Sequence, residues 1–398
     1  MTGAIKSTFD AGFPMEIFGH ADLVIVGAGF YGATIAERAA KARGLKVVIV
    51  EQRSHTGGNS FSERDPDTDI EVHRYGPHIF HTSSEKVWNY VNRFTTFTDY
   101  MHRPYSVSGG EVYPLPISLA TIGQFFRRHM GPDEARALIA EQAAELAGRE
   151  PANLEEKAIS LIGRPLYEAF IRGYTLKQWQ TDPRDLPAAI ITRLPVRYTL
   201  DNRYFSDPHQ GIPADGYAAI FEKMLDNDNI HVLLDADWFE LRSMVPEGMP
   251  ILYTGPIDRY FGYSEGRLGW RTCDFVRSIA PTGDYQGTAV MNYADEDVPH
   301  TRIVEYRHFH PERDYPTDRS VIVHEYSRSA GPGDDPYYPV NTIADKTRYL
   351  AYKERAEQEP NVCFGGRLGT YRYLDMDQAI GAALREWQRL EQSVFRPS

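Results

Sequence analysis

The chain of 398 residues has only two cysteines, Cys273 and Cys363, and no C-x-x-C pair. Two isolated cysteines form neither a disulfide framework nor a cysteine-rich zinc site, which fits a reducing compartment. No apolar run approaches the ~20 residues that a membrane-spanning helix needs, and the first residues lack the basic and apolar regions of a signal peptide. The sequence therefore predicts a cytoplasmic protein without membrane insertion.

An excess of basic residues is also missing, because the net charge is -12. Non-specific binding of nucleic acid needs a basic surface, so we expect no nucleic-acid partner. Hydrophobic residues make up 42% of the chain and aromatic residues 12%, which predicts a fully folded globular protein. The length is sufficient for two or three domains.

Three segments near the N-terminus indicate a βαβ unit. The runs D-L-V-I-V-G (22–27) and K-V-V-I-V-E (46–51) are typical of buried parallel strands, and the alanine-rich segment 31–41 between them is typical of a helix. Such a unit places a parallel sheet at the start of the fold. Strand and helix patterns return at 216–234 and 341–392, so we expect this domain to be built from separated pieces.

Two other regions have a different pattern. Residues 119–200 carry apolar residues at helical spacing, with Asn153 as a helix N-cap, and residues 270–326 alternate at period two between turns. They predict a helical lobe and an antiparallel sheet. The expected boundaries are 1–20 for an N-terminal extension; 21–105, 207–262 and 340–398 for the Rossmann-like domain; 116–200 for the helical lobe, with a mobile loop near 190–205; and 263–330 for the antiparallel sheet, with strands from about 95–115.

The motif G-A-G-F-Y-G matches the dinucleotide fingerprint G-x-G-x-x-G. Gly27 allows the tight turn after the strand, Gly29 allows a pyrophosphate to approach the backbone, and Gly32 allows the helix to pack on the strand. Glu51 ends the next strand, where an acidic side chain binds a ribose hydroxyl. The alternative is a glycine-rich turn without a ligand, but the strand before the motif and the helix after it favour the nucleotide site.

A second glycine turn follows soon after Glu51, in Q-R-S-H-T-G-G-N, and a third, G-G-R, lies at 365–367. NAD-binding domains have no general need for these extra close approaches, whereas the longer FAD molecule does. FAD is therefore favoured over NAD. The expected fold class is α/β: a discontinuous Rossmann-like FAD-binding domain with an inserted helical lobe and an antiparallel β-sheet domain.

The chain resembles the bacterial UDP-galactopyranose mutases in a series of motifs, which extends from Asp22 to the last helix. These include V-G-A-G-F-Y-G-A, E-Q-R-x-x-x-G-G-N, Y-G-P-H-I-F-H-T, G-Y-T-L-K-Q-W, R-L-P-V-R-Y, V-P-H-T-R-I-V-E, P-Y-Y-P-V-N and G-G-R-L-G-T-Y-R-Y-L-D-M. The segments G-Y-T-L-K-Q-W and R-L-P-V-R are much more restricted to this family than the glycine fingerprint.

The resemblance implies an isomerase that interconverts UDP-galactopyranose and UDP-galactofuranose without net redox change, supplying galactofuranose for cell-surface glycans. In that family, N5 of reduced FAD attacks the anomeric carbon, UDP leaves, and the sugar ring opens and recloses through a flavin-sugar iminium. An external reductant for FAD and a homodimer or higher homo-oligomer are implied as well. The alternative from the glycine motifs alone is an FAD-dependent oxidoreductase of the amine-oxidase or desaturase type, or a nucleotide-binding module without activity.

The resemblance assigns catalytic roles to two arginines and two histidines. Arg193 and Arg302 match the family's diphosphate clamp, and a guanidinium fork suits phosphate oxygens; a surface ion pair is the alternative for each. His78 and His81 lie in the turn Y-G-P-H-I-F-H-T, which the family places against the flavin, with one histidine near N5. No carboxylate or cysteine lies at a ligand-like spacing from them, so we expect no metal. A structural histidine is the alternative, above all for His81.

The remaining assignments also follow from the resemblance. The expected substrate-binding residues are Phe170, Tyr174, Thr175, Trp179, Arg193, Tyr204, Phe205, Asn292, Arg302, Tyr338 and Tyr373. The expected cofactor-binding residues are Gly27, Gly29, Phe30, Gly32, Glu51, Gln52, Arg53, Gly58, Asn59, His78, Ile79, Gly366, Arg367, Tyr373, Asp375 and Met376. Core packing is the alternative for the aromatic residues, Tyr337 and Tyr371 are the alternatives one or two positions away, and Asp375 can instead cap the last helix.

Overall fold

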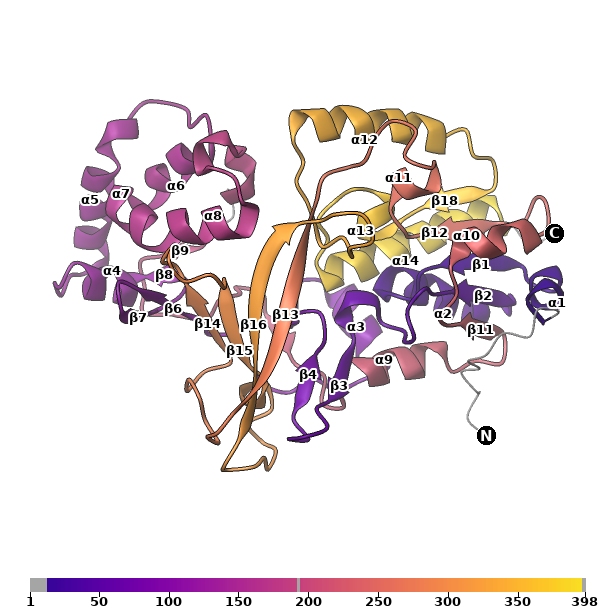
Figure 1. The fold of residues 1–398 in the computed structure, drawn as a ribbon, viewed down its shortest axis with the longest axis horizontal. Coiled ribbons are helices and arrows are strands. Elements are labelled where there is room, and N and C mark those ends of the chain that lie inside the picture. The colour runs from indigo at the N-terminus through magenta and orange to yellow at the C-terminus, as the bar shows by residue number, and fades with distance from the viewer. Residues whose placement is uncertain (1–12, 192–193, 396–398) are drawn as a thin grey trace.

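The computed structural model describes residues 13–191 and 194–395, which form an α/β domain, a large sheet and a helical lobe (Figure 1). The α/β domain is built on a parallel five-stranded sheet of order β11-β2-β1-β12-β18. Its strands are β1 Leu23–Val26, β2 Val47–Val50, β11 Ile230–Leu233, β12 Ile251–Tyr253 and β18 Val362–Phe364. The predicted βαβ unit is present, with α2 Phe30–Arg43 between β1 and β2.

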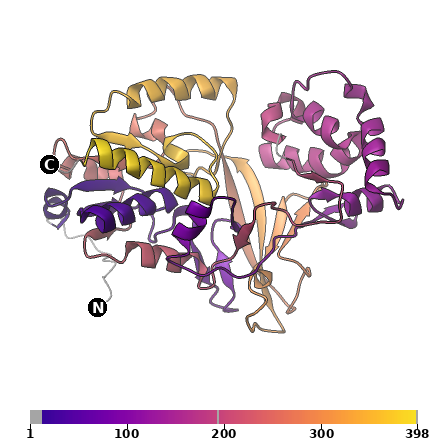
Figure 2. The ribbon, with the colours of Figure 1, turned by 180° about the vertical axis from the view of Figure 1, so that it is seen from behind.

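Both faces of this sheet are covered, which explains the continuous apolar runs in β1 and β2. Leu23 and Ile25 face α2 and α14 Met376–Ser393, together with Trp387 of α14. Val24 and Val26 face the opposite side, where they pack with Trp238 and Phe18. In the reverse view α14, the yellow helix, lies across the sheet near the indigo α2 (Figure 2).

The N-terminal extension predicted at 1–20 ends in a helix, α1 Phe13–Gly19. Phe18 of α1 is fully buried beside Val24 and Trp238. Residues 13–20 therefore form part of the core of the α/β domain, which the sequence pattern did not indicate. Residues 1–12 lie outside the described ranges.

A seven-stranded sheet of order β17-β13-β16-β15-β14-β6-β7 separates the α/β domain from the helical lobe (Figure 1). Its strands are β6 Tyr105–Ser108, β7 Glu111–Pro114, β13 Trp270–Ala280, β14 Val290–Tyr293, β15 Arg302–Glu305, β16 Ser320–Ser329 and β17 Tyr338–Pro339. The sheet is mostly antiparallel, as predicted, and β14 pairs with β6 in parallel. These strands come from distant segments, so no hairpin forces them to run in opposite directions.

The helical lobe contains α4 Leu119–Phe125, α5 Pro132–Gln142, α6 Leu154–Ile162, α7 Arg164–Leu166 and α8 Gly173–Trp179. Asn153 caps α6, because its side chain accepts a hydrogen bond from the Glu156 amide at 2.9 Å, as predicted. A π-helical turn, Tyr167–Arg172, leads into α8. Such turns shift the helical register and are common at functional sites.

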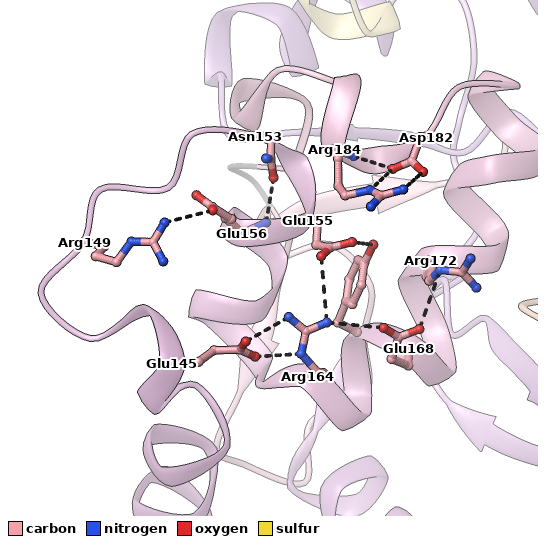
Figure 3. A network of polar contacts seen from close by, with 11 residues as sticks. Glu145, Arg149, Asn153, Glu155, Glu156, Arg164, Glu168, Arg172, Asp182 and Arg184 are labelled. Carbon is pink, nitrogen blue, oxygen red and sulfur yellow. Dashed lines mark hydrogen bonds and ion pairs between the residues drawn. The ribbon is translucent and has the colours of Figure 1, made fainter.

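Charged side chains on the lobe form the network shown in Figure 3. Arg164 makes a bidentate contact with Glu145, at 2.8 and 2.9 Å, and also lies near Glu155 and Glu168. Glu168 in turn lies 3.7 Å from Arg172. Single exposed pairs contribute little to stability. The network instead orients the helices that lead into α8.

The remaining elements connect these parts. They are β3 Ser62–Arg64, β4 Glu71–His73, β5 Phe80–Thr82, α3 Glu85–Val91, β8 Ile117–Ser118, β9 Val196–Arg197, β10 His209–Gly211, α9 Gly216–Leu225, α10 Trp238–Leu241, α11 Ile257–Tyr260, α12 Ile343–Ala356 and α13 Gly366–Gly369. Within residues 13–191 and 194–395, no helix combines the length and the apolar character that crossing a membrane requires.

Candidate active site

A large cavity of about 2570 Å³ lies where the three parts of the molecule meet. It is lined by residues of the α/β domain, by α8 of the helical lobe, and by strands of the seven-stranded sheet. The predicted residues that line it are Gly27, Gly29, Phe30, Gly32, Glu51, Gln52, Arg53, Gly58, Asn59, His78, Ile79, His81, Phe170, Tyr174, Thr175, Trp179, Tyr204, Phe205, Asn292, Arg302, Tyr338, Gly366, Arg367, Tyr373, Asp375 and Met376. Arg193 lies outside the described residues.

The glycine fingerprint forms the turn from β1 into α2. Gly27 has φ +102°, and a Cβ there would overlap Oγ1 of Thr254. A Cβ on Gly32 would overlap the carbonyl oxygen of Gly27 and approach Cγ2 of Ile25 to 3.0 Å. Both glycines therefore allow the helix to pack directly on the strand, as their spacing predicts.

The N-terminus of α2 opens into the cavity. Its N-cap, Gly29, supplies no capping side chain. The first amides of a helix have no partner within the helix, and they carry a partial positive charge. A helix of 14 residues that begins in this way is suited to bind a phosphate group.

Glu51 lies at the end of β2 beside this helix N-terminus. Its two carboxylate oxygens accept hydrogen bonds from the amides of Ala28, at 2.8 Å, and Arg53, at 2.9 Å. Only 6% of Glu51 is exposed, and burial raises the pKa of its carboxyl group. Each carboxylate oxygen has a second acceptor position, so these bonds leave capacity to bind a hydroxyl group.

Arg53 connects the second glycine turn to a loop that follows β16. Its guanidinium donates to Asn59 Oδ1 at 2.9 Å and to Asp335 Oδ2 at 2.8 Å. It also lies over the ring of Tyr75, 4.1 Å from the centroid. Both hydrogen bonds come from Nη2, and they connect Arg53 to Asn59 of the second glycine turn and to Asp335 of the loop.

Arg302 is the first residue of β15 and lines the cavity. Its Nη2 donates a hydrogen bond of 2.7 Å to the hydroxyl oxygen of Tyr174 on α8. Its Nε lies 3.4 Å from Oε1 of Glu325, which is 3% exposed. The side chain thus joins the helical lobe to the sheet, and Arg302 lines the cavity.

Two tyrosines predicted to contact phosphate lie side by side. The rings of Tyr338 and Tyr373 stack with their centroids 5.8 Å apart. Tyr371 instead donates to the carbonyl oxygen of Gly269 at 2.7 Å and packs in the core, which favours Tyr373 as the site residue. Tyr337 lines the cavity next to Tyr338, so both neighbours in the P-Y-Y-P segment reach the site.

His78 is held by its own turn. Its Nδ1 lies 2.7 Å from the carbonyl oxygen of Gly76, and its amide donates to Nδ1 of His73 at 2.9 Å. Burial lowers the pKa of His78 to about 4, so the imidazole is neutral at neutral pH. A neutral ring that contacts a carbonyl through Nδ1 must carry its hydrogen there, which leaves Nε2 as an acceptor.

His81 has a different environment on β5. Its Nδ1 lies 2.7 Å from Oδ2 of Asp207, and its ring stacks on Phe205 with the centroids 3.7 Å apart. His81 therefore orients Phe205, which was predicted to contact the nucleotide. The geometry favours His78, rather than His81, as the histidine that acts at the cofactor.

Phe170 combines two environments that the sequence could not separate. It packs against Tyr113 of β7 with the ring centroids 5.0 Å apart, in the core of the helical lobe. One edge of it also lines the cavity. Phe170 is therefore a core residue that contributes to the cavity wall.

Asp375 is the N-cap residue of α14, and its amide donates to Oε1 of Gln378 at 3.2 Å. Asp375 also lines the cavity, so the cap and the site are compatible roles for it.

Two residues that contact the site were not predicted from the sequence, His102 and Glu325. His102 is 7% exposed, and its ring lies near those of Tyr204 and Phe205. Its Nδ1 lies 3.1 Å from the hydroxyl oxygen of Tyr100. Burial lowers the pKa of His102 to about 3. Glu325, the other missed residue, faces Arg302 from β16. Its inward position in the alternating run S-V-I-V-H-E-Y was the only available signal, since a buried acid in a strand requires a partner.

One group of possible metal ligands lies elsewhere among the described residues. It consists of Glu305 at the end of β15, Asp284 in the loop between β13 and β14, and His308 shortly after β15. The Glu305 carboxylate accepts hydrogen bonds from the amides of Tyr285 and Gln286, and Asp284 accepts one from Gly287. The loop therefore uses these oxygens itself, and the three residues do not line the cavity.

The chain matches the family model of UDP-galactopyranose mutase over residues 169–373, and that of an NAD(P)-binding Rossmann-like domain over residues 25–94. It is 46% identical to a probable UDP-galactopyranose mutase of Klebsiella pneumoniae, over 94% of this chain and 95% of that protein. It is 42% identical to the dTDP-fucopyranose mutase of Escherichia coli, over 91% and 96%. A UDP-galactopyranose mutase of Mycoplasma genitalium is 30% identical over 93% and 94%.

The fold is similar to that of reduced UDP-galactopyranose mutase in a crystal structure, with a TM-score of 0.69, 14% identity and coverage of 94% and 95%. A crystal structure of a putative protoporphyrinogen oxidase from Exiguobacterium is similar with a TM-score of 0.61 and 14% identity. The predicted fold class, a Rossmann-like domain with a separate, mostly antiparallel sheet, is confirmed. Together with the long matches to the sequences of mutases, these results show that the chain belongs to the UDP-galactopyranose mutase family of isomerases.

Proposed function

We propose that this protein interconverts UDP-galactopyranose and UDP-galactofuranose with reduced FAD as its cofactor. The observation that carries the proposal is the convergence of the predicted nucleotide, sugar and phosphate residues on one cavity. The similarity to mutases over more than nine-tenths of the chain supports the same reaction. The product would serve as the galactofuranose donor for cell-surface glycans.

The residues along the cavity fit FAD. The uncapped N-terminus of α2 is suited to its pyrophosphate, and the buried carboxylate of Glu51 is suited to a ribose hydroxyl. The second glycine turn approaches the first so closely that a Cβ on Gly58 would lie 3.2 Å from Cα of Gly29. The two turns therefore contact each other through their backbones and form one surface without side chains, along which an extended chain can lie. When bound in its reduced form, FAD supplies the nucleophile for the anomeric carbon.

Arg302 would bind the diphosphate of the substrate. Its guanidinium remains charged at all relevant pH values, and its orientation is set by Tyr174 and Glu325. As the bond to the anomeric carbon breaks, negative charge develops on UDP, and a fixed cation stabilises that charge most effectively in a partly buried site. The same contact retains UDP until the ring has reclosed.

The tyrosines would act as neutral donors to the same phosphates. Burial raises the pKa of the Tyr338 hydroxyl well above its ordinary value, and it raises the pKa of the Tyr373 hydroxyl as well. Both hydroxyls therefore keep their protons at neutral pH, and they donate hydrogen bonds without adding charge. Removing either hydroxyl should weaken the binding of UDP more than that of FAD.

His78 would accept a hydrogen bond at the cofactor. Its Nδ1 is engaged by Gly76, so the neutral ring offers Nε2 to a donor in the cavity. A group of this kind holds a proton in position but does not donate one at neutral pH. This supports a role of His78 in orienting the flavin rather than in protonating the sugar.

The direct test is an isomerisation assay. Purified protein is incubated with UDP-galactofuranose and dithionite, and the products are separated by chromatography. We expect UDP-galactopyranose to appear only when the flavin is reduced. If the pyranose never appears, or appears equally without reduction, the proposal is wrong, and consumption of a reductant in proportion to product would indicate an oxidoreductase instead.

The same assay separates two substrate classes. A 42% identical relative is named for dTDP-fucopyranose, so that compound is tested in parallel. We expect a higher kcat/KM for the UDP-sugar. The reverse order would assign the protein to the dTDP-6-deoxysugar reaction.

Arg193 is proposed as the second arginine of the diphosphate clamp. Arg193→Ala should keep its bound flavin and lose most of its turnover, as measured by absorbance and by the isomerisation assay. Equal loss of flavin and activity would contradict this role and indicate a structural one.

A further inference from the structure

We propose that Lys177 is a positioning residue that joins the two halves of the nucleotide-binding surface by binding the loop between β14 and β15. This inference rests on the proposed binding of a UDP-sugar in the cavity. The side chain of Lys177 contacts this loop, and Lys177 is not one of the residues that line the cavity.

The ammonium group of Lys177 is surrounded by main-chain oxygens. Its Nζ lies 2.7 Å from the carbonyl oxygen of Tyr293, 2.8 Å from that of Asp295, 3.0 Å from that of Val298 and 3.1 Å from that of His300. We call these four oxygens the carbonyl cluster. An ammonium has three N–H donors, so every donor is used and one is shared. The dipoles of converging main-chain oxygens repel one another, and the positive charge of the ammonium offsets this repulsion.

The carbonyl cluster belongs to the loop whose two ends carry predicted substrate residues. Asn292 and Arg302 are paired directly across β14 and β15, and both line the cavity. Residues 293–301 connect them. The loop therefore joins the strand ends that carry the amide of Asn292 and the guanidinium of Arg302, and its conformation contributes to their positions.

Lys177 comes from the opposite wall of the cavity. It lies on α8, which also carries Tyr174, Thr175 and Trp179. The hydrogen bond from Arg302 to the Tyr174 hydroxyl crosses between the two walls. Lys177 makes the second connection between them, about one helical turn further along α8.

The surrounding contacts show that α8 packs closely against the loop between β14 and β15. A Cβ on Gly173, at the start of α8, would overlap the carbonyl oxygen of Ala294. Arg172, one residue earlier, forms an ion pair with Glu296 of the same loop and lies near Glu168 in the network of Figure 3. The helix thus packs against the loop backbone, and Lys177 is the residue that reaches into it.

The charge of Lys177 depends on pH. Burial lowers its pKa to about 8, whereas Asp295, Glu296 and Asp297 of the loop favour the charged form. His300 also faces it, but burial lowers the pKa of His300 to about 4, so this ring is neutral at neutral pH. Above about pH 8 the amine has two N–H groups and a lone pair, which faces the carbonyl oxygens and repels them.

The test measures UDP binding by calorimetry to the flavin-loaded protein, for the wild type and for Lys177→Met. We expect the Kd of the variant to rise by about tenfold or more, with flavin content unchanged and kcat at saturating substrate reduced less than kcat/KM. Lys353→Met is the matched control, because Lys353 is exposed and pairs only with Glu357 on the outside of α12. It should bind UDP like the wild type.

Chemical rescue makes the test specific. Lys177→Cys treated with 2-bromoethylamine carries an ammonium on a side chain of the same length, and it should regain most of the lost affinity. The wild type is treated in parallel, because Cys363 is partly exposed and Cys273 is buried. In addition, the Kd of the wild type should rise between pH 7.5 and 9, whereas that of Lys177→Met should not.

The outcomes are distinguishable. If the wild type does not bind UDP, the proposed function is wrong. If the wild type binds UDP and Lys177→Met binds it equally well, or if the alkylated Lys177→Cys shows no recovery, the positioning role is overturned. If Lys177→Met and Lys177→Arg both lose folded, flavin-bound protein, Lys177 is required for folding and the positioning role is overturned as well.

Discussion

Arg302 and Tyr174 show how two residues from different parts of the chain form one functional group. The guanidinium is oriented by a neutral hydroxyl acceptor at 2.7 Å and by the buried carboxylate of Glu325 at 3.4 Å. The guanidinium of Arg302 stays protonated beside both partners. A cation that is held in this way loses little conformational freedom when it binds a phosphate, which favours tight binding.

Tyr174→Phe removes the acceptor from Arg302 while it preserves the ring. The loss of one hydrogen bond to a charged group costs about 1.5–3 kcal/mol, which corresponds to a Kd for UDP that is about 10- to 150-fold higher. Calorimetry on the flavin-bound protein measures the change. Tyr285→Phe, at a position that is 46% exposed, is the control and should not change the Kd. Unchanged affinity in Tyr174→Phe would show that the hydroxyl does not orient Arg302.

His102 makes stability depend on pH. Its pKa is about 3 in the folded state, against an ordinary value of about 6.5, so the unfolded chain binds the additional proton between these values. Stability therefore falls as the pH decreases from 6.5 toward 3. At pH 5 the loss from this residue alone is about 2 kcal/mol relative to pH 8.

Urea unfolding at pH 8 and pH 5 tests this linkage. In His102→Gln, the decrease in the free energy of unfolding should be smaller than in the wild type by about 2 kcal/mol. His231→Gln, at an exposed position of β11, should show the decrease of the wild type. The same acid dependence in all three proteins would mean that His102 is not buried in its neutral form.

At the scale of elements, the two glycine turns approach each other closely at one edge of the parallel sheet. Gly29 begins α2, and Gly58 lies in the turn after β2 with φ +57°. Their backbones are close because neither residue has a side chain. This arrangement requires β1 and β2 to be neighbours in the sheet, which the βαβ unit ensures.

Gly58→Ala should reduce the binding of flavin. The added Cβ would lie 3.2 Å from Cα of Gly29, which is closer than ordinary contact, so the two turns would have to move apart. Gly109→Ala is a matched control, because Gly109 has the same φ of +57° and nothing lies within 4 Å of an added Cβ. Both variants carry a similar backbone strain of about 1 kcal/mol, but only Gly58→Ala should lose flavin absorbance. Equal flavin content in the two purified proteins would contradict the close-approach role of Gly58.

At the scale of the whole molecule, the cavity is lined by residues of the α/β domain, the seven-stranded sheet and the helical lobe. The lobe is connected to the sheet through α8, which contacts β16 and the loop between β14 and β15. A ligand in the cavity therefore contacts all three parts. Its binding should stabilise the molecule as a whole, because it binds the folded state alone.

UDP should raise the thermal stability of the flavin-bound protein. At a concentration of 100 times Kd, the free energy of unfolding should increase by about 2.7 kcal/mol. Arg302→Lys, tested at the same UDP concentration, should show almost no increase, since a lysine cannot reproduce the guanidinium fork. Equal stabilisation of both proteins, measured by calorimetric unfolding, would place the UDP outside the Arg302 site.

The homo-oligomer expected from the family resemblance stays a prediction.

Local patterns in the sequence were sufficient to predict the βαβ unit, the cap of α6 by Asn153, and the strands and helices that return near the C-terminus. These features depend on periodicity, on capping side chains and on glycine geometry, which act between residues close in sequence. The family motifs also indicated residues that line the cavity, since short segments carry them. Only the tertiary structure placed Glu325 beside Arg302 and His102 beside Phe205. It also decided that β14 pairs with β6 in parallel and that α1 packs into the core. The carbonyl cluster around Lys177 depends on tertiary structure most of all, because main-chain oxygens are present at every residue and only the fold decides where four of them converge.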